Sequence, residues 1–186
     1  VANDAAEDDR FGDSVAVSGD LVVVGAYGDD DAGSGSGSAY VFRTTNDGAS
    51  WTQVAKLVAN DAAASDYFGG SVAVSGDLLV VGAYGNDDAG SWSGSAYVFR
   101  TTNDGASWTQ TAKLVASDAA EEDYFGISVA ISGDLVVVGA RGNDDAGSAS
   151  GSAYVFRTTN GGASWTQTAK LVASDAAKSD YFGYSV

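Results

Sequence analysis

The stretch FGGSVAVSGDLLVVGA, residues 68–83, decides the fold, because it returns almost unchanged at residues 11–26 and 125–140. A fourth copy begins at Phe182 and ends with Val186. Equivalent residues are 57 positions apart, which divides the chain into repeats 1–57, 58–114 and 115–171 and the start of a fourth repeat at 172–186. Tandem repeats of this kind are typical of arrays in which each unit packs only against its neighbours.

Each repeat contains four short segments with the pattern of β-strands. In the first repeat, residues 14–19 alternate between Val and small residues, and the pair Gly19-Asp20 favours a two-residue hairpin turn. Residues 21–26 are apolar at successive positions, which predicts a strand covered on both faces. Residues 39–43 and 51–59 supply a third and a fourth strand. The sequence therefore predicts an all-β fold of tandem four-stranded antiparallel blades, forming a β-propeller or an open blade array, with little helix.

Charge and composition exclude several classes of function. The chain has 25 acidic and 9 basic residues, no His and a formal net charge of −16, which disfavours nucleic acid and anionic membranes as partners. Without Cys, neither disulfides nor thiolate metal sites are available. The apolar runs are too short to cross a bilayer, so no membrane span is expected.

Two motifs resemble those of known propeller families. Phe68-Gly69 before the first strand and Val81-Gly82-Ala83 at the end of the second resemble the FG-GAP repeat of integrin-type propellers. The segment TTNDGASW resembles the Asp-box turn of sialidase-type propellers, with Asn103 at the Asp position. Both resemblances imply propeller blades, and we expect an extracellular or cell-surface protein. Integrin-type repeats carry a calcium loop between the two FG-GAP marks, whereas only Ser-Gly-Asp joins those strands here, so that metal site is not carried over.

The number of blades raises the question of closure. Propellers close with about four to eight blades, so three blades and the start of a fourth are too few for a ring. The chain is expected to be part of a longer propeller, to close with a second chain, or to form an open helical array. Arrays normally need polar capping repeats, and neither end of this chain has one. We therefore expect further blades beyond both ends.

Acidic loops suggest a calcium site at one rim of the blades. Successive turns of an antiparallel meander alternate between the two ends of a sheet, so the loop between strands two and three shares an end with the acidic link before strand one. Calcium prefers six to eight oxygen ligands. The candidate ligands are Asp9, Asp29, Asp30 and Asp31 in the first repeat, Asp66, Asp87 and Asp88 in the second, and Asp123, Asp144 and Asp145 in the third. The alternative interpretation is that these are solvated turn residues that keep the array soluble.

Positions that differ between the repeats are the best candidates for recognition. Gly35, Trp92 and Ala149 are equivalent positions. Two further sets of equivalent positions also differ: Arg10, Tyr67, Tyr124 and Tyr181, and Tyr27, Tyr84 and Arg141. We expect Trp92 to be an exposed aromatic residue that stacks on a sugar or anchors a protein contact. Drift at a tolerant loop position is the alternative.

An enzyme needs a unique set of reacting groups, and this chain repeats nearly all of its acidic and basic residues. His-based and Cys-based catalysis is excluded by composition. The expected function is a non-enzymatic extracellular structural or adhesive repeat protein that associates with like repeats or with copies of itself into an array or filament. The alternative is a calcium-dependent propeller module that binds a carbohydrate or a cell-surface protein. A glycosidase-like enzyme ranks third.

Overall fold

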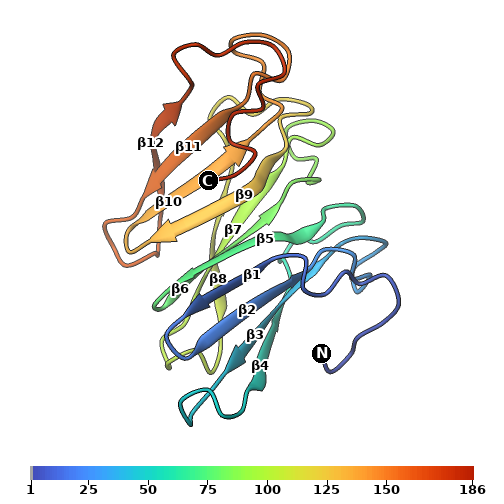
Figure 1. The fold of residues 1–186 in the computed structure, drawn as a ribbon, viewed down its shortest axis with the longest axis vertical. Helices are drawn as coiled ribbons and strands as arrows, with labels where there is room; N and C mark the ends of the chain where they lie inside the picture. Colours follow the sequence, from blue (N-terminus) through green and yellow to red (C-terminus); the bar gives the residue numbers. More distant parts are fainter. Residues whose placement is uncertain (1) are drawn as a thin grey trace.

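The chain folds into three four-stranded antiparallel sheets, one from each of the first three repeats (Figure 1). The computed structural model describes residues 2–186. The first sheet contains β1 (Val15–Ser18), β2 (Leu21–Ala26), β3 (Ser38–Arg43) and β4 (Thr52–Leu57). The second contains β5 (Phe68–Ser75), β6 (Leu78–Ala83), β7 (Ser95–Arg100) and β8 (Thr109–Leu114). The third contains β9 (Phe125–Ser132), β10 (Leu135–Ala140), β11 (Ser152–Arg157) and β12 (Thr166–Leu171). The predicted all-β blades are confirmed, and no helix occurs within residues 2–186.

The tight turn predicted between the first two strands of each repeat is present. Ser18 pairs with Leu21, so that only Gly19 and Asp20 remain in the turn. Gly19 has a φ of 54°, in the left-handed region that glycine enters most readily. The same turn joins β5 to β6 and β9 to β10.

The three sheets pack face to face in the order of the chain (Figure 1). β5 contacts β1 and β2, and β9 contacts β5 and β6. The boundary between the first two sheets contains Leu21, Val23, Val41 and Leu57 from the first and Phe68, Leu79, Val81 and Phe99 from the second, all buried. Every residue of β6 is buried, as its continuous apolar run predicts for a strand covered on both faces. Apolar burial between blades therefore holds the array together.

The Phe-Gly pair of each repeat is bound to the blade before it. Phe68 donates its backbone N–H to the carbonyl oxygen of Ser36 at 3.1 Å. The Ser14 hydroxyl donates to the carbonyl oxygen of Gly69 at 2.7 Å. Residues 172–186 bind the third blade in the same way, and Phe182 donates its N–H to the Ser150 carbonyl oxygen at 2.9 Å. Each blade is therefore fastened by the opening residues of the following repeat.

The Asp-box-like turn between strands three and four also contributes to the blade boundary. Asn103 Oδ1 accepts the backbone N–H of Ser107 at 2.9 Å and closes the turn. Trp108, which follows the turn, packs against the apolar core between the first and second blades. A Cβ on Gly105 would lie 2.7 Å from a methyl carbon of Leu21 in the preceding blade. The turn thus carries a large apolar side chain to the neighbouring sheet.

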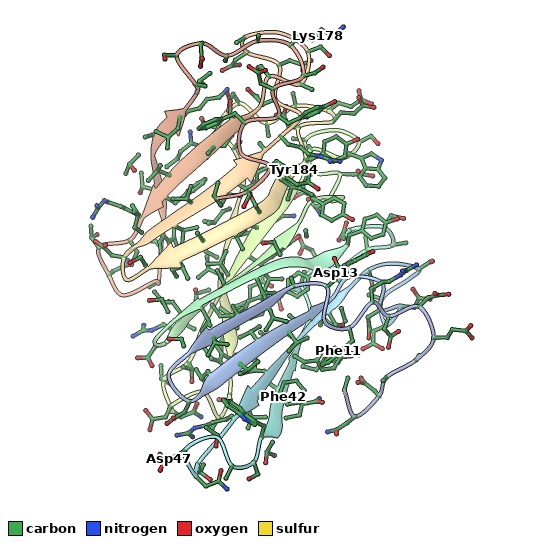
Figure 2. The ribbon with its side chains drawn as sticks, viewed as in Figure 1. Phe11, Asp13, Phe42, Asp47, Lys178 and Tyr184 are labelled. Atoms are coloured by element: carbon green, nitrogen blue, oxygen red, sulfur yellow. The ribbon has the colours of Figure 1, made fainter. Side chains whose placement is uncertain are left out.

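The first and third blades each leave one face without a neighbouring blade. On the first blade, Phe11, Val22, Val24, Phe42 and Trp51 line an apolar hollow of about 340 Å³. Trp51 is 42% exposed. The side chains of Phe11 and Phe42 lie together on this sheet (Figure 2). Their counterparts in the second blade, Phe68 and Phe99, are buried under the first blade.

Candidate functional site

The acidic loops of the first blade surround the ammonium group of Lys56. Lys56 Nζ lies 2.7 Å from Asp4 Oδ2, 3.0 Å from Asp29 Oδ2 and 2.5 Å from Asp31 Oδ2. These carboxylate oxygens lie within 4.8 Å of one another. The side chain of Lys56 comes from β4 and also lies over the ring of Tyr40. A positive charge of the protein itself therefore occupies the centre of the acidic cluster.

The charges in this cluster stabilise one another. Burial alone would raise the pKa of Asp29, but hydrogen bonds from Lys56, the Asp31 backbone N–H and Ser38 outweigh it, and the pKa is lowered. Burial alone would lower the pKa of Lys56, but hydrogen bonds to Asp31, Asp4 and Asp29 raise it. Both groups are therefore charged at neutral pH, and the pair favours the folded state.

The second and third blades repeat this arrangement with one acid fewer. Lys113 pairs with Asp61 and Asp88, and Lys170 pairs with Asp118 and Asp145. The position of Asp29 is taken by Asn86 and Asn143. The Tyr40 hydroxyl donates to Asp29 at 3.0 Å, whereas the buried hydroxyls of Tyr97 and Tyr154 have no hydrogen-bond partner within residues 2–186. The cluster around Lys56 is thus the most acidic of the three.

The aspartates predicted to bind calcium divide into three structural groups. Asp9, Asp66 and Asp123 each accept a backbone N–H from the residue three positions earlier. Asp30, Asp87 and Asp144 each accept a backbone N–H from the residue five positions later. Asp31, Asp88 and Asp145 pair with lysines, and so does Asp29. Calcium binding stays a prediction, and calcium would have to compete with Lys56 for the only cluster of three carboxylates within residues 2–186.

Burial changes the titration of the turn aspartates in the second and third repeats. Desolvation raises the pKa of Asp66 despite the hydrogen bonds that it accepts from Ala63 and Asn86. Asp123 behaves in the same way, with Ala120 and Asn143 as its donors. Both carboxylates thus help to close the link that precedes their blade.

Trp92 lies in an aromatic cluster, which we define as Tyr27, Tyr67, Tyr84, Trp92 and Tyr124. The Trp92 ring is stacked on Tyr67 and Tyr84, with centroids 5.6 and 6.2 Å apart, and lies 5.7 Å from Tyr124. The sequence indicated an exposed side chain, but these rings leave Trp92 half-buried. A role in ligand binding stays a prediction.

The aromatic cluster contains at least one residue from each of the three sets of equivalent positions that differ between the repeats. Arg141 extends the cluster into the third blade, with its guanidinium 4.7 Å from the ring centroid of Tyr124 and 5.6 Å from that of Tyr184. A further cavity of about 230 Å³ is lined by Asp13 and Tyr184, which come from opposite ends of the chain and are labelled in Figure 2. Gly70 and Ile127, which occupy the equivalent position in the second and third repeats, line the same cavity. Much of the variation between the repeats therefore falls on one surface. Sequence reasoning did not include this fourth set of positions, although its residues differ between all the repeats.

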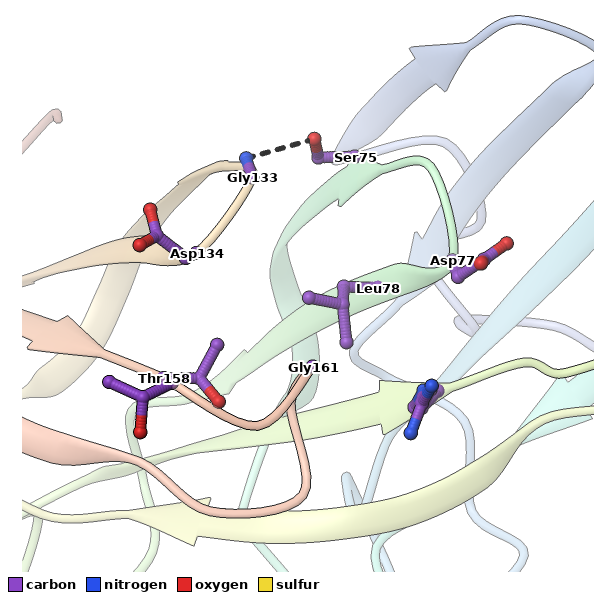
Figure 3. Close-up of a pocket in the computed structure, with 9 residues that line it drawn as sticks. Ser75, Asp77, Leu78, Gly133, Asp134, Thr158 and Gly161 are labelled. Carbon is purple, nitrogen blue, oxygen red and sulfur yellow. Dashed lines mark hydrogen bonds between the residues drawn. The ribbon is translucent and has the colours of Figure 1, made fainter.

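The hollows at the other end of the blades recur at equivalent places. The cavity between the second and third blades has a volume of about 440 Å³ and lies beside the turn that contains Gly133 and Asp134 (Figure 3). The N–H of Gly133 donates to the Ser75 hydroxyl across this boundary at 3.2 Å (Figure 3). A matching cavity of about 360 Å³ between the first two blades is lined by Asp20 and Asp77. Because the two cavities recur at equivalent places, we interpret them as a consequence of blade packing and not as a specific binding site.

Four-stranded antiparallel blades that pack face to face define a propeller-type repeat protein. The sequence model of the FG-GAP repeat matches residues 1–42, 51–99, 108–156 and 165–186, and the chain belongs to this family. A solved structure, the crystal structure of the Saccharomyces cerevisiae Sqt1, is similar in fold, with a TM-score of 0.57 and 12% sequence identity. The similarity covers 91% of this chain and 38% of that one, so the present chain matches well under half of the yeast protein. No curated protein sequence is similar enough to count as a relative. Within residues 2–186, no helix is long and apolar enough to cross a membrane.

Proposed function

We propose that this chain is a non-enzymatic structural or adhesive repeat protein of the cell exterior, whose blades assemble with like blades into a larger array. The outer face of the first blade carries the proposal. Its residues Val22, Val24 and Phe42 line an apolar hollow, whereas Leu79, Val81 and Phe99 at the same positions of the second blade are buried by the blade before them. A further blade of the same kind fits the open face by continuing an interface that already exists twice.

The outer face of the third blade offers the other half of this interface. Leu135, Val137, Val155 and Leu171 are the counterparts of Leu21, Val23, Val41 and Leu57, which are buried at the first boundary. Leu171 is 44% exposed, whereas Leu57 is 5% exposed. The two open faces differ from each other, so their association is head-to-tail and continues from one copy to the next.

Residues 172–186 affect how two copies can join. They lie against the third blade as the corresponding residues 58–72 lie against the first, with Tyr181 N–H donating to the Ala149 carbonyl oxygen at 3.1 Å. The first 15 residues of an incoming copy are equivalent to this segment and would need the same place. Head-to-tail docking therefore requires one segment to displace the other, which predicts slow association.

Two observations support a non-enzymatic role outside the cell. The chain has no His or Cys, and Asp20, Asp77 and Asp134, which line the larger hollows, occupy equivalent turns rather than one unique site. Membership of the FG-GAP repeat family supports the location, because such repeats are typical of extracellular proteins.

The test is the mass of the protein under native conditions over a range of protein and salt concentrations. The net charge of −16 opposes association, so added salt is expected to increase the fraction of multimers. Val22→Glu places a charge on the open face and should leave single chains, while Thr109→Glu adds the same charge at an exposed position of the second blade and should not. A single-chain mass of the unmodified protein under all these conditions would refute assembly through blade faces.

The aromatic cluster favours a second candidate function, a module that binds a partner through this surface. Tyr, Trp and Arg dominate the contacts of many binding sites, because they combine apolar area with polar groups. At two of the sets of positions, the one that contains Tyr67 and the one that contains Trp92, the backbone has a similar positive φ in every repeat.

A further inference from the structure

The second repeat fills a space that the third repeat leaves open. Trp92 packs among Tyr67, Tyr84 and Tyr124, and the equivalent of Trp92 in the third repeat is Ala149. At Ala149 there is a cavity of about 320 Å³. Its walls include Tyr124, Arg141 and Tyr181, which are the counterparts of the three tyrosines around Trp92. The cavity is thus the place of a missing indole ring.

The backbone has nearly the same conformation at Trp92 and at Ala149. Trp92 has a φ of 57° and Ala149 a φ of 53°, both in the left-handed region. The N–H of Trp92 donates to Asp87 Oδ1 at 2.8 Å, and the N–H of Ala149 donates to Asp144 Oδ1 at 2.6 Å. A tryptophan at position 149 would therefore project from the same backbone as Trp92.

The walls of the cavity suit a flat aromatic group. The ring of Tyr124 contacts the guanidinium of Arg141, which takes the place of the Tyr84 ring. A guanidinium stacks on aromatic rings nearly as an aromatic side chain does, and it adds an attraction between its charge and the ring. Half-exposed Tyr181 forms a further wall. An indole that enters beside Arg141 would find contacts of the kind that Trp92 makes.

The rim of the cavity is acidic, which favours an occupant with a positive charge. Glu121, Glu122 and Asp144 line it, against the one positive charge of Arg141. The counterparts of the two glutamates in the second repeat are Ala64 and Ser65. The open cavity therefore carries two negative charges that the filled site around Trp92 lacks, and these favour a positively charged group next to the ring.

We propose that the cavity at Ala149 binds an indole-sized aromatic side chain that lies next to a positive charge on a protein partner. This inference deepens the second candidate function and does not depend on blade assembly. The residues that form the site are Glu121, Glu122, Tyr124, Arg141, Asp144, Ala149 and Tyr181.

The direct probe is tryptamine, which combines an indole with an ammonium group. We expect it to bind the full chain at one site with a Kd on the order of millimolar, typical of a fragment of this size, as measured by calorimetry or ligand-observed NMR. N-acetyltryptophanamide has the same ring without charge, and indole-3-acetate carries a negative charge. Affinity should be highest for tryptamine, lower for N-acetyltryptophanamide and lowest for indole-3-acetate, and added salt should weaken tryptamine binding.

The second repeat supplies the matched variants. Ala149→Trp fills the cavity from within and should remove tryptamine binding. The double variant Glu121→Ala, Glu122→Ser gives the rim the residues of the second repeat, and it should reduce the preference for tryptamine over N-acetyltryptophanamide. Trp92→Ala should open a second cavity among Tyr67, Tyr84 and Tyr124 and raise the number of indole sites from one to two. Circular dichroism checks that each variant is folded.

Three results would overturn the proposal. The first is an absence of tryptamine binding by the unmodified chain, and the second is binding that Ala149→Trp leaves unchanged. The third is binding of a neutral oligosaccharide that Ala149→Trp removes while no indole probe binds, which would assign the cavity to a sugar. A native mass that shows single chains would refute blade assembly but leave this site intact.

Discussion

Gly25 and Gly69 meet backbone to backbone across the boundary between the first and second blades. A Cβ on Gly25 would lie 2.0 Å from the carbonyl oxygen of Gly69. The same approach joins Gly82 to Gly126 and Gly139 to Gly183. The two halves of the FG-GAP motif are therefore halves of one contact, in which the GA of each blade lies against the FG of the next repeat.

Gly82→Ala should destabilise the protein strongly, because the new Cβ would lie 1.9 Å from the Gly126 carbonyl oxygen and the blades would have to separate. We expect a loss of about 3 kcal/mol in urea unfolding, at the upper end for overpacked sites. Gly76→Ala is the control, since its Cβ meets nothing within 4 Å and only its positive φ of 55° carries a cost. Equal losses in the two variants would contradict the close approach.

Trp108→Ala should cost about 2–3 kcal/mol, because this ring packs into the core between the first two blades and donates Nε1–H to the Gly105 carbonyl oxygen at 3.1 Å. Trp51→Ala changes the equivalent residue on the open face of the first blade and should cost less than about 1 kcal/mol in dilute solution. Unfolding in urea measures both. If Trp51→Ala proved as costly as Trp108→Ala, the first blade would be covered in solution.

Trp92→Ala tests the importance of the aromatic cluster for stability. A side chain exposed in a loop could be removed without cost, as the sequence suggested for Trp92. Its contacts with three tyrosine rings predict instead a loss of about 1–2 kcal/mol in thermal or urea unfolding. Trp92→Phe keeps an aromatic ring and should recover part of this loss. No change in either variant would show that the rings do not stabilise the fold.

Lys56→Met would test whether the acidic cluster can hold calcium. Removal of the ammonium leaves the carboxylates of Asp4, Asp29 and Asp31 within 4.8 Å of one another without a counter-charge. The variant should melt at a lower temperature in chelator than the unmodified protein and regain stability in millimolar calcium, more than in magnesium. Lys170→Met is the control, because only Asp118 and Asp145 remain there, and its recovery should be smaller. Melting curves of Lys56→Met that ignore calcium would remove the calcium hypothesis for this cluster.

Asp29→Asn should change how stability depends on pH. The pKa of Asp29 is lowered from 3.8 in the folded protein, so its contribution is present above about pH 4 and is lost as the pH falls through the folded value. Asparagine is the residue at this position in the other two blades, so the variant should fold normally. We expect a loss of about 1 kcal/mol at pH 7 that shrinks toward pH 2. A loss of stability of the same size at both pH values would show that the charge of Asp29 does not stabilise the folded protein.

The repeat pattern was enough to predict the blades. It did not predict the place of Lys56 or the burial of Trp92, because both depend on contacts between residues that are distant in the sequence. Alternation and the Gly19-Asp20 pair specify strands and turns locally, and both are confirmed by the pairing of Ser18 with Leu21. The place of Lys56 was missed, because the side of the sheet on which a β4 residue emerges depends on a register shift between Val41 and Phe42. The half-burial of Trp92 depends on rings from two repeats, whose proximity follows only from blade packing.

The contact between each repeat and the blade before it also affects how the number of repeats in such a protein can change during evolution. Because every boundary joins one 57-residue unit to the next through the same pair of positions, unequal crossing-over between copies would delete or add whole units and still leave matched surfaces at the new joint. Natural variants of this protein are therefore expected to differ in size by multiples of one repeat, each as well packed as its parent.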